Sequence, residues 1–75
     1  MSSVKPHLMI TIQINGNDEN IMTNMSLAEL IVLKNIQPQS VAIVMNSDVV
    51  PRSRWPYVQC QASDKVELFS VVAGG

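Results

Sequence analysis

Hydrophobic and polar residues alternate near the start of the chain, in the segment "HLMITIQIN". A period of two over this length predicts a β-strand with one buried face. The strand is expected to separate its side chains onto two faces: Leu8, Ile10, Ile12 and Ile14 against Met9, Thr11 and Gln13. We expect the following segment, "NGNDEN", to form a hairpin turn around Asn15-Gly16, and residues 21–24 to return as a short second strand.

The stretch "SLAE" predicts the start of a helix. Ser26 stands three residues before Glu29, so each side chain can accept a hydrogen bond from the other residue's backbone amide, the pattern called a capping box. Met25 and Leu30 hold the two positions of a hydrophobic staple. We expect one helix over residues 27–34, ended by an asparagine and a proline beyond it. Its β-branched residues weaken its intrinsic propensity, so it needs a core to pack on, and the side chains expected to dock are Leu27, Leu30 and Ile31.

Three extended segments are expected in the second half of the chain. Residues 41–46, "VAIVMN", are apolar at successive positions, which is typical of a strand covered on both faces. "VVPR" follows a turn, and Pro51 limits it to an edge. "SRWPYVQC" is expected to be an irregular loop or a single helical turn, because Pro56 blocks a longer helix. Residues 65–72 predict the last strand, with its side chains again on two faces: Lys65, Glu67, Phe69 and Val71 against Val66, Leu68, Ser70 and Val72.

The expected order of elements is β-β-α-β-β-β. One helix packed on one face of a mixed sheet of four to five strands is an α+β fold. We expect residues 1–75 to form a single domain with a flexible tail at 73–75. A core of this size supplies at most about 3–5 kcal/mol of net stability, and it has no room for a buried multi-residue active site.

Composition argues against several classes of function. The net charge of −1, with five Lys and Arg residues, does not suit a nucleic-acid binder. A single cysteine excludes an internal disulfide and a four-cysteine metal site. The start "MSSVKPHL" lacks the apolar run of a signal peptide, and no segment approaches the ~20 apolar residues of a membrane span. We therefore expect a cytoplasmic protein without cofactor or metal. Since 47% of the residues are hydrophobic, some apolar surface is expected to meet partners.

The reactive side chains form no recognisable catalytic group. His7 has no second histidine to work with, and Cys60 has no histidine near it in sequence. A surface position for the first and an inert packing role for the second are favoured. Asp48, Asp64 and Glu67 could act as paired carboxylates, but turn chemistry and solubility explain them without catalysis.

A small cationic and aromatic group lies at Arg52, Arg54 and Trp55. One interpretation is a contact patch for a partner. We favour the other, in which Trp55 covers the core and the two arginines are solvated beside it.

The chain has three glycines, and two of them occupy its last two positions. A frayed terminus is one explanation. A more specific one is that Ala73, Gly74 and Gly75 can thread a channel too narrow for side chains, because glycine has no Cβ. Three extended residues reach about 10 Å beyond the domain. The carboxylate at their tip is then a group that another enzyme could activate.

Two segments carry a resemblance to a known family. "MNSDVVPRSRW" and "SDKVELFSVVAGG" resemble the sulfur carriers of thiamine biosynthesis, which are small ubiquitin-like proteins with the β-grasp fold. The "VPR..W" run, from Val50 to Trp55, is fairly specific to that family. One departure is Ser63-Asp64, where the family usually has Gly-Asp. The chain also lacks the paired prolines that molybdopterin-type carriers often have before the two glycines, which favours the thiamine branch.

The resemblance implies that the chemistry occurs at Gly75. An adenylyltransferase of the ubiquitin-activating type would join AMP from ATP to the Gly75 carboxylate. Sulfur from a donor such as a cysteine desulfurase would displace the AMP, and thiazole synthase would take sulfur from the resulting thiocarboxylate into the thiazole ring of thiamine. The chain would be a co-substrate and not an enzyme, with Ala73 and Gly74 threaded into the partner's active site. Neither nucleic acid nor a membrane would take part.

The same resemblance implies that the last strand lies centrally in the sheet and directs the tail outward. If the opposite face of that strand packs on the helix, Phe69 and Val71 face away from it. An exposed Phe69 close to the tail would be a natural anchor for the adenylyltransferase. With Arg52, these residues are the expected partner-binding surface.

Three other functions remain open on the sequence alone. The chain could deliver sulfur to the molybdenum cofactor, or it could be a ubiquitin-like modifier that forms amides with lysines of target proteins. It could also be a β-grasp binding module with an incidental tail. Loss of function on tail deletion would exclude the binding module, and the absence of larger conjugates in a lysate would exclude the modifier.

Overall fold

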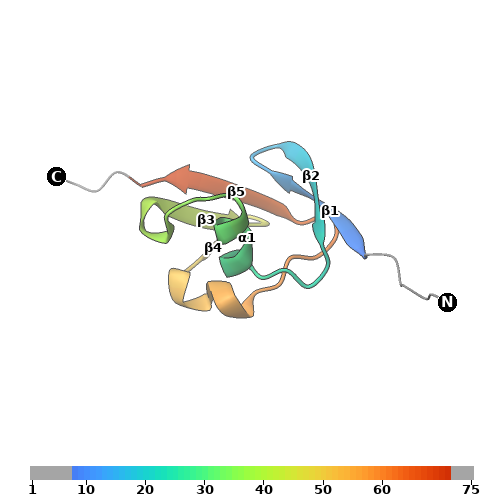
Figure 1. The fold of residues 1–75 in the computed structure, drawn as a ribbon. Helices are drawn as coiled ribbons and strands as arrows, with labels where there is room; N and C mark the ends of the chain where they lie inside the picture. Colours follow the sequence, from blue (N-terminus) through green and yellow to red (C-terminus); the bar gives the residue numbers. More distant parts are fainter. Residues whose placement is uncertain (1–7, 72–75) are drawn as a thin grey trace.

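The computed structural model describes residues 8–71 of the chain (Figure 1). His7, Val72 and the tail at 73–75 lie outside the described residues. The elements follow the predicted order, with two short 3-10 helices added: β1 (Met9–Ile14), β2 (Asn17–Met22), α1 (Leu27–Leu33), η1 (Pro38–Ser40), β3 (Val41–Met45), β4 (Asp48–Val50), η2 (Arg52–Tyr57) and β5 (Lys65–Ser70).

The hairpin of β1 and β2 has a shorter turn than expected. Asn15 and Gly16 have positive φ angles of 51° and 85°, as a two-residue hairpin turn of this type requires. Pairing with β1 resumes at Asn17. The expected turn over the whole of "NGNDEN", with a strand only at 21–24, is therefore wrong. The tight turn sets the register at once, and polar residues are accepted in β2 because it is an edge strand with largely exposed side chains.

Helix α1 forms where the capping signals predict it. The Ser26 hydroxyl accepts a hydrogen bond from the Glu29 amide at 3.1 Å, and the Glu29 carboxylate accepts one from the Ser26 amide at 2.9 Å. At the other end Asn35 has a φ of 62°, and the Ile36 amide donates to the Ile31 carbonyl at 3.1 Å, which closes the last turn. The side chains buried by the helix are the predicted ones, Leu27, Leu30 and Ile31.

The five strands form one mixed sheet in the order β2-β1-β5-β3-β4. Strand β5 lies in the centre, as predicted, and it is parallel to β1 and antiparallel to β3. Figure 1 shows β5 running through the middle of the molecule between the β1–β2 hairpin and β3.

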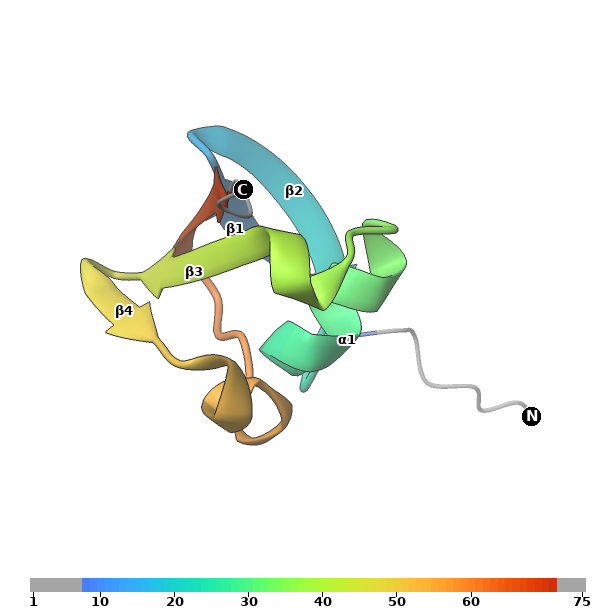
Figure 2. The same ribbon diagram turned by 90° about the vertical axis from the view of Figure 1, so that its left-hand side faces the viewer.

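The helices lie on the concave face of the curved sheet (Figure 2). This confirms the α+β prediction of one main helix packed on one face of the sheet. The core between the two layers consists of Ile12, Ile14, Ile21, Leu27, Leu30, Ile31, Ile43, Trp55, Cys60 and Val66.

Strand β3 corrects the expectation of a strand covered on both faces. Ile43 is fully buried, but its neighbours Ala42 and Val44, which lie on the other face, are only half-buried. A run of apolar residues therefore does not require two covering layers, because small and β-branched residues also fit a half-exposed sheet surface. The segment after the edge strand β4 is the 3-10 helix η2, which includes Pro56.

Candidate functional site

The end of β5 is the part of the described structure closest in sequence to the predicted reactive tail. Val71, the last described residue, donates its backbone N–H to the carbonyl of Ser40 at 2.8 Å. Ser40 ends η1 directly before β3, so this bond holds the end of β5 against the start of β3. Four residues follow Val71 in the sequence. The last described residue, two positions before the tail at 73–75, is thus held on the sheet.

An apolar patch surrounds this point on the outer face of the sheet, away from α1. Phe69 is 50% exposed and Val71 is 47% exposed, as expected from the alternation along the last strand. Ala42 pairs with Phe69 across β3, and Val44 pairs with Val49 across β4. We call Ala42, Val44, Val49, Phe69 and Val71 the outer-face patch.

Arg52 lies next to this patch. It begins η2 with an exposed side chain, and it lines a shallow surface groove together with Val49, Trp55 and Val71. The structure therefore brings Arg52 and Val71 together at one groove. Phe69 lies two residues before Val71 and therefore on the same face of the sheet.

Trp55 covers the core, as favoured from the sequence. It is 3% exposed, and its indole N–H donates to the Val50 carbonyl at 2.9 Å. This bond ties η2 to the edge strand β4 and satisfies the only polar atom of the side chain. Arg52 and Arg54 both precede it in the sequence, and both are exposed.

Cys60 is not placed to act as a nucleophile. Its side chain is 1% exposed. Burial, helped by the nearby charge of Asp64, raises the pKa of the thiol to about 11, so it stays protonated at neutral pH. Asp64 itself accepts hydrogen bonds from the Gln61 backbone amide at 2.7 Å and from the Asn46 side-chain amide at 2.9 Å. This confirms a turn-forming role for Asp64.

The remaining candidates do not converge. Asp48 starts the edge strand β4, whereas Glu67 lies on β5, and both are exposed. Within residues 8–71, no group of three or more His, Cys, Asp or Glu side chains could hold a metal ion. None of the helices in the described segment has both the length and the apolar character needed to cross a membrane. His7 lies outside the described residues.

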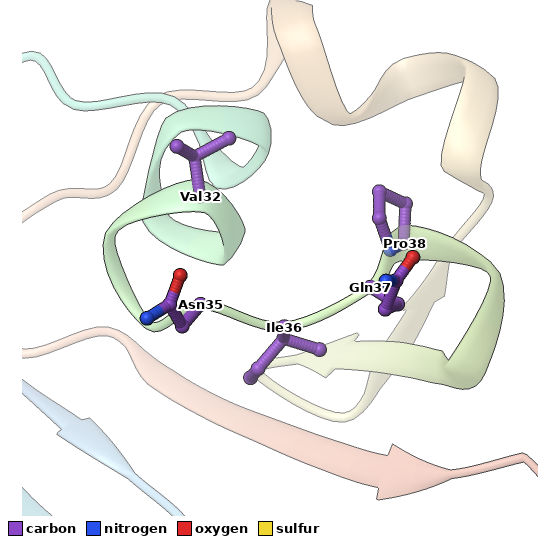
Figure 3. A pocket seen from close by; sticks show the side chains of 5 residues that line it. All are labelled: Val32, Asn35, Ile36, Gln37 and Pro38. Atoms are coloured by element: carbon purple, nitrogen blue, oxygen red, sulfur yellow. The ribbon is translucent and has the colours of Figure 1, made fainter.

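A hollow at the end of α1 was not anticipated from the sequence. Figure 3 shows it between the helix and η1, lined by Val32, Asn35, Ile36, Gln37 and Pro38. These side chains include no acid, base or nucleophile. The hollow therefore offers no chemistry of its own.

Two turn asparagines hold β5 in position, a role that the sequence alone did not predict for them. The Asn15 side-chain carbonyl accepts a hydrogen bond from the Leu68 amide at 2.8 Å. The Asn46 side-chain carbonyl accepts one from the Lys65 amide at 2.9 Å. Both asparagines sit in turns at positive φ, and that turn preference is their only local signal.

The fold has a clear counterpart among solved structures. The thiamine biosynthesis protein (ThiS) from Geobacter metallireducens superimposes with a TM-score of 0.76 at 23% sequence identity, over 88% of this chain and all of that one. This likeness confirms the predicted β-grasp fold.

Three relatives are similar in sequence. The "Uncharacterized protein ycf40" of Porphyra purpurea is 33% identical over 66 residues, or 88% of this chain and 93% of that protein, and its namesake from Pyropia yezoensis is 30% identical over 69 residues. A thiazole synthase of Paramagnetospirillum magneticum is 29% identical over 62 residues, and there the chain spans only 19% of the relative's length. The model of the ThiS family matches residues 12–75. The chain therefore belongs to the ThiS family.

Proposed function

We propose that this chain is a sulfur carrier of thiamine biosynthesis whose reactive group is the carboxylate of Gly75. The observation that carries the proposal is the family match, which extends through both glycines at positions 74 and 75. Membership of the ThiS family supports a thiamine-related sulfur carrier. The single domain of residues 1–75 then serves to present its tail, 73–75, to other proteins.

The fold suits this task because the tail follows the central strand. Strand β5 is flanked by β1 and β3, and Val71 is bonded to Ser40. A tail that starts from a rigid, central element has a defined origin, which helps to bring its reactive end into a partner's active site. Ala73 and Gly74 would pass through that site with little steric demand.

The proposed reaction has three steps, all on the partner enzymes. An oxygen of the Gly75 carboxylate attacks the α-phosphorus of ATP, forming an acyl adenylate and releasing pyrophosphate. The outer sulfur of a persulfide on the donor then attacks the acyl carbon, and AMP leaves. A thiol of the partner proteins attacks the donor's cysteine sulfur in the resulting acyl disulfide, which leaves a thiocarboxylate on Gly75 and a disulfide between the thiol and the donor. Within this scheme the chain supplies the acyl group and no catalytic side chain, so it is a co-substrate and not an enzyme.

The partners follow from the same scheme. An ATP-using adenylyltransferase performs the first step, a sulfur donor such as a cysteine desulfurase serves the second, and thiazole synthase receives the sulfur. The similarity to part of a thiazole synthase supports the last of these. The outer-face patch with Arg52 is proposed as the contact for the adenylyltransferase, because a half-exposed aromatic beside a groove and a cation is typical of binding hot spots.

The test is ATP–pyrophosphate exchange with the cognate adenylyltransferase. Deleting Gly75 withdraws the carboxylate by about 3.3 Å, and adding one residue beyond Gly75 moves it forward by as much. Each change should abolish exchange, since a misplacement of about 1 Å can lower a rate about a hundredfold. Thermal stability should stay at the wild-type value, because neither change touches the core. Normal exchange by the shortened chain would refute the proposal.

Three further measurements separate the alternatives. Intact mass of the protein from its native cells should reveal a fraction with oxygen replaced by sulfur at the C-terminus. A ladder of larger conjugates in a lysate blot would instead indicate a ubiquitin-like modifier. Transfer of the sulfur to a molybdopterin precursor, and not to thiazole synthase, would indicate the molybdenum-cofactor pathway.

A further inference from the structure

Strand β5 has neighbours on both sides only along its first half. Strand β1 pairs with it at two positions, where Gln13 and Ile14 lie opposite Lys65 and Val66. The chain then leaves for β2 through the turn at Asn15. Strand β3, in contrast, pairs with β5 as far as Ser70. In Figure 1, the end of β5 extends past the turn of the β1–β2 hairpin.

The direction of the backbone groups shows which of them are left open. In an antiparallel pair, alternate residues point both N–H and C=O at the partner strand. The bonds of the Val71 amide to Ser40 and of the Asn46 amide to the Lys65 carbonyl assign the odd-numbered residues of β5 to β3. Leu68 and Ser70 therefore point toward the side that β1 has left.

Of the four backbone N–H and C=O groups of Leu68 and Ser70, only the Leu68 amide has a hydrogen-bond partner on this side within residues 8–71. The Leu68 amide donates to the Asn15 side chain at 2.8 Å. Among residues 8–71, the hydrogen bonds found outside the strand ladders include none to the Leu68 carbonyl or to either backbone group of Ser70. Ser70 is also exposed. These three groups form a short open edge in the otherwise central strand; we call it the β5 edge.

We infer that the adenylyltransferase binds this carrier by adding an extended segment of its own as a strand along the β5 edge. The inference rests on the proposed function and names how that partner holds the carrier. An unpaired strand edge is a template for main-chain hydrogen bonds from another chain. The segment would pair with the Leu68 carbonyl and with the N–H and C=O of Ser70.

Two features of the structure favour this partner over a second copy of the chain. The β5 edge adjoins the outer-face patch, since Phe69 lies between the two open residues, so side chains of an added segment would lie beside Phe69 and Val71. The edge offers only three backbone groups, which is too few to hold a stable strand-paired dimer by itself. Because only two residues separate Ser70 from the tail at 73–75, strand addition would also fix the direction of the last residues.

Proline substitution at Ser70 tests the inference. Ser70 lies opposite Val41 in a pair without mutual hydrogen bonds, so Ser70→Pro removes an N–H that the sheet does not use. Ser70→Ala is the matched control, because it removes the hydroxyl and keeps the N–H. In titrations with the cognate adenylyltransferase, we expect Ser70→Pro to bind roughly three- to tenfold more weakly than Ser70→Ala, as expected for one lost hydrogen bond.

Amide hydrogen exchange of the wild-type chain provides a second readout that does not depend on the variant's folding. The Ser70 amide should exchange rapidly in the free carrier and become protected in the complex, whereas the Phe69 amide, directed at β3, should be protected in both. Equal affinity of the two variants with an unprotected Ser70 in the complex would overturn the inference. Protection of Ser70 in the carrier alone, lost on dilution, would also overturn it and indicate a second copy. Failure of the wild-type chain to support ATP–pyrophosphate exchange would refute the proposed function instead.

Discussion

Replacing Phe69 with alanine should weaken binding to the adenylyltransferase without unfolding the carrier. Complete burial of a phenylalanine side chain is worth about 1.5–3 kcal/mol. Phe69 is 50% exposed in the free chain, so a partner can still remove about half of its surface from water. The expected loss is therefore about 0.8–1.5 kcal/mol, or roughly four- to twelvefold in Kd. The fold should be retained, because the core lies on the other sheet face.

The assay is a titration of the adenylyltransferase with the carrier, followed by ATP–pyrophosphate exchange at increasing carrier concentration. Phe69→Ala should raise KM for the carrier and leave kcat nearly unchanged, because Phe69 belongs to the proposed binding surface and not to the tail that carries the reacting carboxylate. Tyr57→Ala is the matched control, since Tyr57 is an aromatic residue that is 81% exposed on η2. An unchanged Kd for Phe69→Ala, or an equal loss for Tyr57→Ala, would refute the reasoning.

Two further predictions concern the core. Leu30→Ala, at a fully buried position of α1, should lower the free energy of unfolding by about 2–5 kcal/mol, which is most of the stability of so small a domain. Val32→Ala is the control, because Val32 is 72% exposed on the same helix, and it should leave the urea midpoint nearly unchanged. Fluorescence of the buried Trp55 reports the unfolding, and similar midpoints for the two variants would show that the docking face is misassigned. The pKa of the Cys60 thiol is raised from 9.0 to about 11 in the folded chain. Between pH 9 and 11 only the unfolded chain loses this proton, so the free energy of unfolding should fall over this range and should not depend on the thiol below about pH 9. Denaturation across this range should show a smaller decline in Cys60→Ala, and an identical decline would exclude the thiol as its cause.

Local signals in the sequence were sufficient for much of the fold. The capping box at Ser26 and Glu29 and the turn at Asn15-Gly16 each depend on neighbours within a few residues, and both were predicted correctly. The extent of β2 was predicted incorrectly, because its polar residues have low strand propensity and fit a strand only at the edge of the sheet. Which strand lies at an edge is a property of the whole sheet, and no short window of sequence contains it.

The same distinction separates the predicted and unpredicted parts of the site. The exposed Phe69 followed from strand alternation, and its face was therefore predictable. The groove that joins Arg52 to Val71 was not, because it forms only when η2 and the end of β5 meet in space. The hydrogen bond from the Leu68 amide to the Asn15 side chain was not predictable either, because it joins residues 53 positions apart.

The β5 edge shows how a functional surface can arise without any characteristic residue. Backbone groups are the same at every position, so what distinguishes Ser70 is only that β1 ends before reaching it. Lengthening β1 would pair the edge and close it, whereas shortening it would move Asn15 away and leave the Leu68 amide open as well. Where the backbone of β1 turns away, the Asn15 side chain accepts a hydrogen bond from the Leu68 amide. The open region is therefore limited to the Leu68 carbonyl and the two backbone groups of Ser70. A strand can therefore be held between two neighbours along part of its length, so that the tail has a fixed origin, and still have unpaired backbone groups where a partner binds.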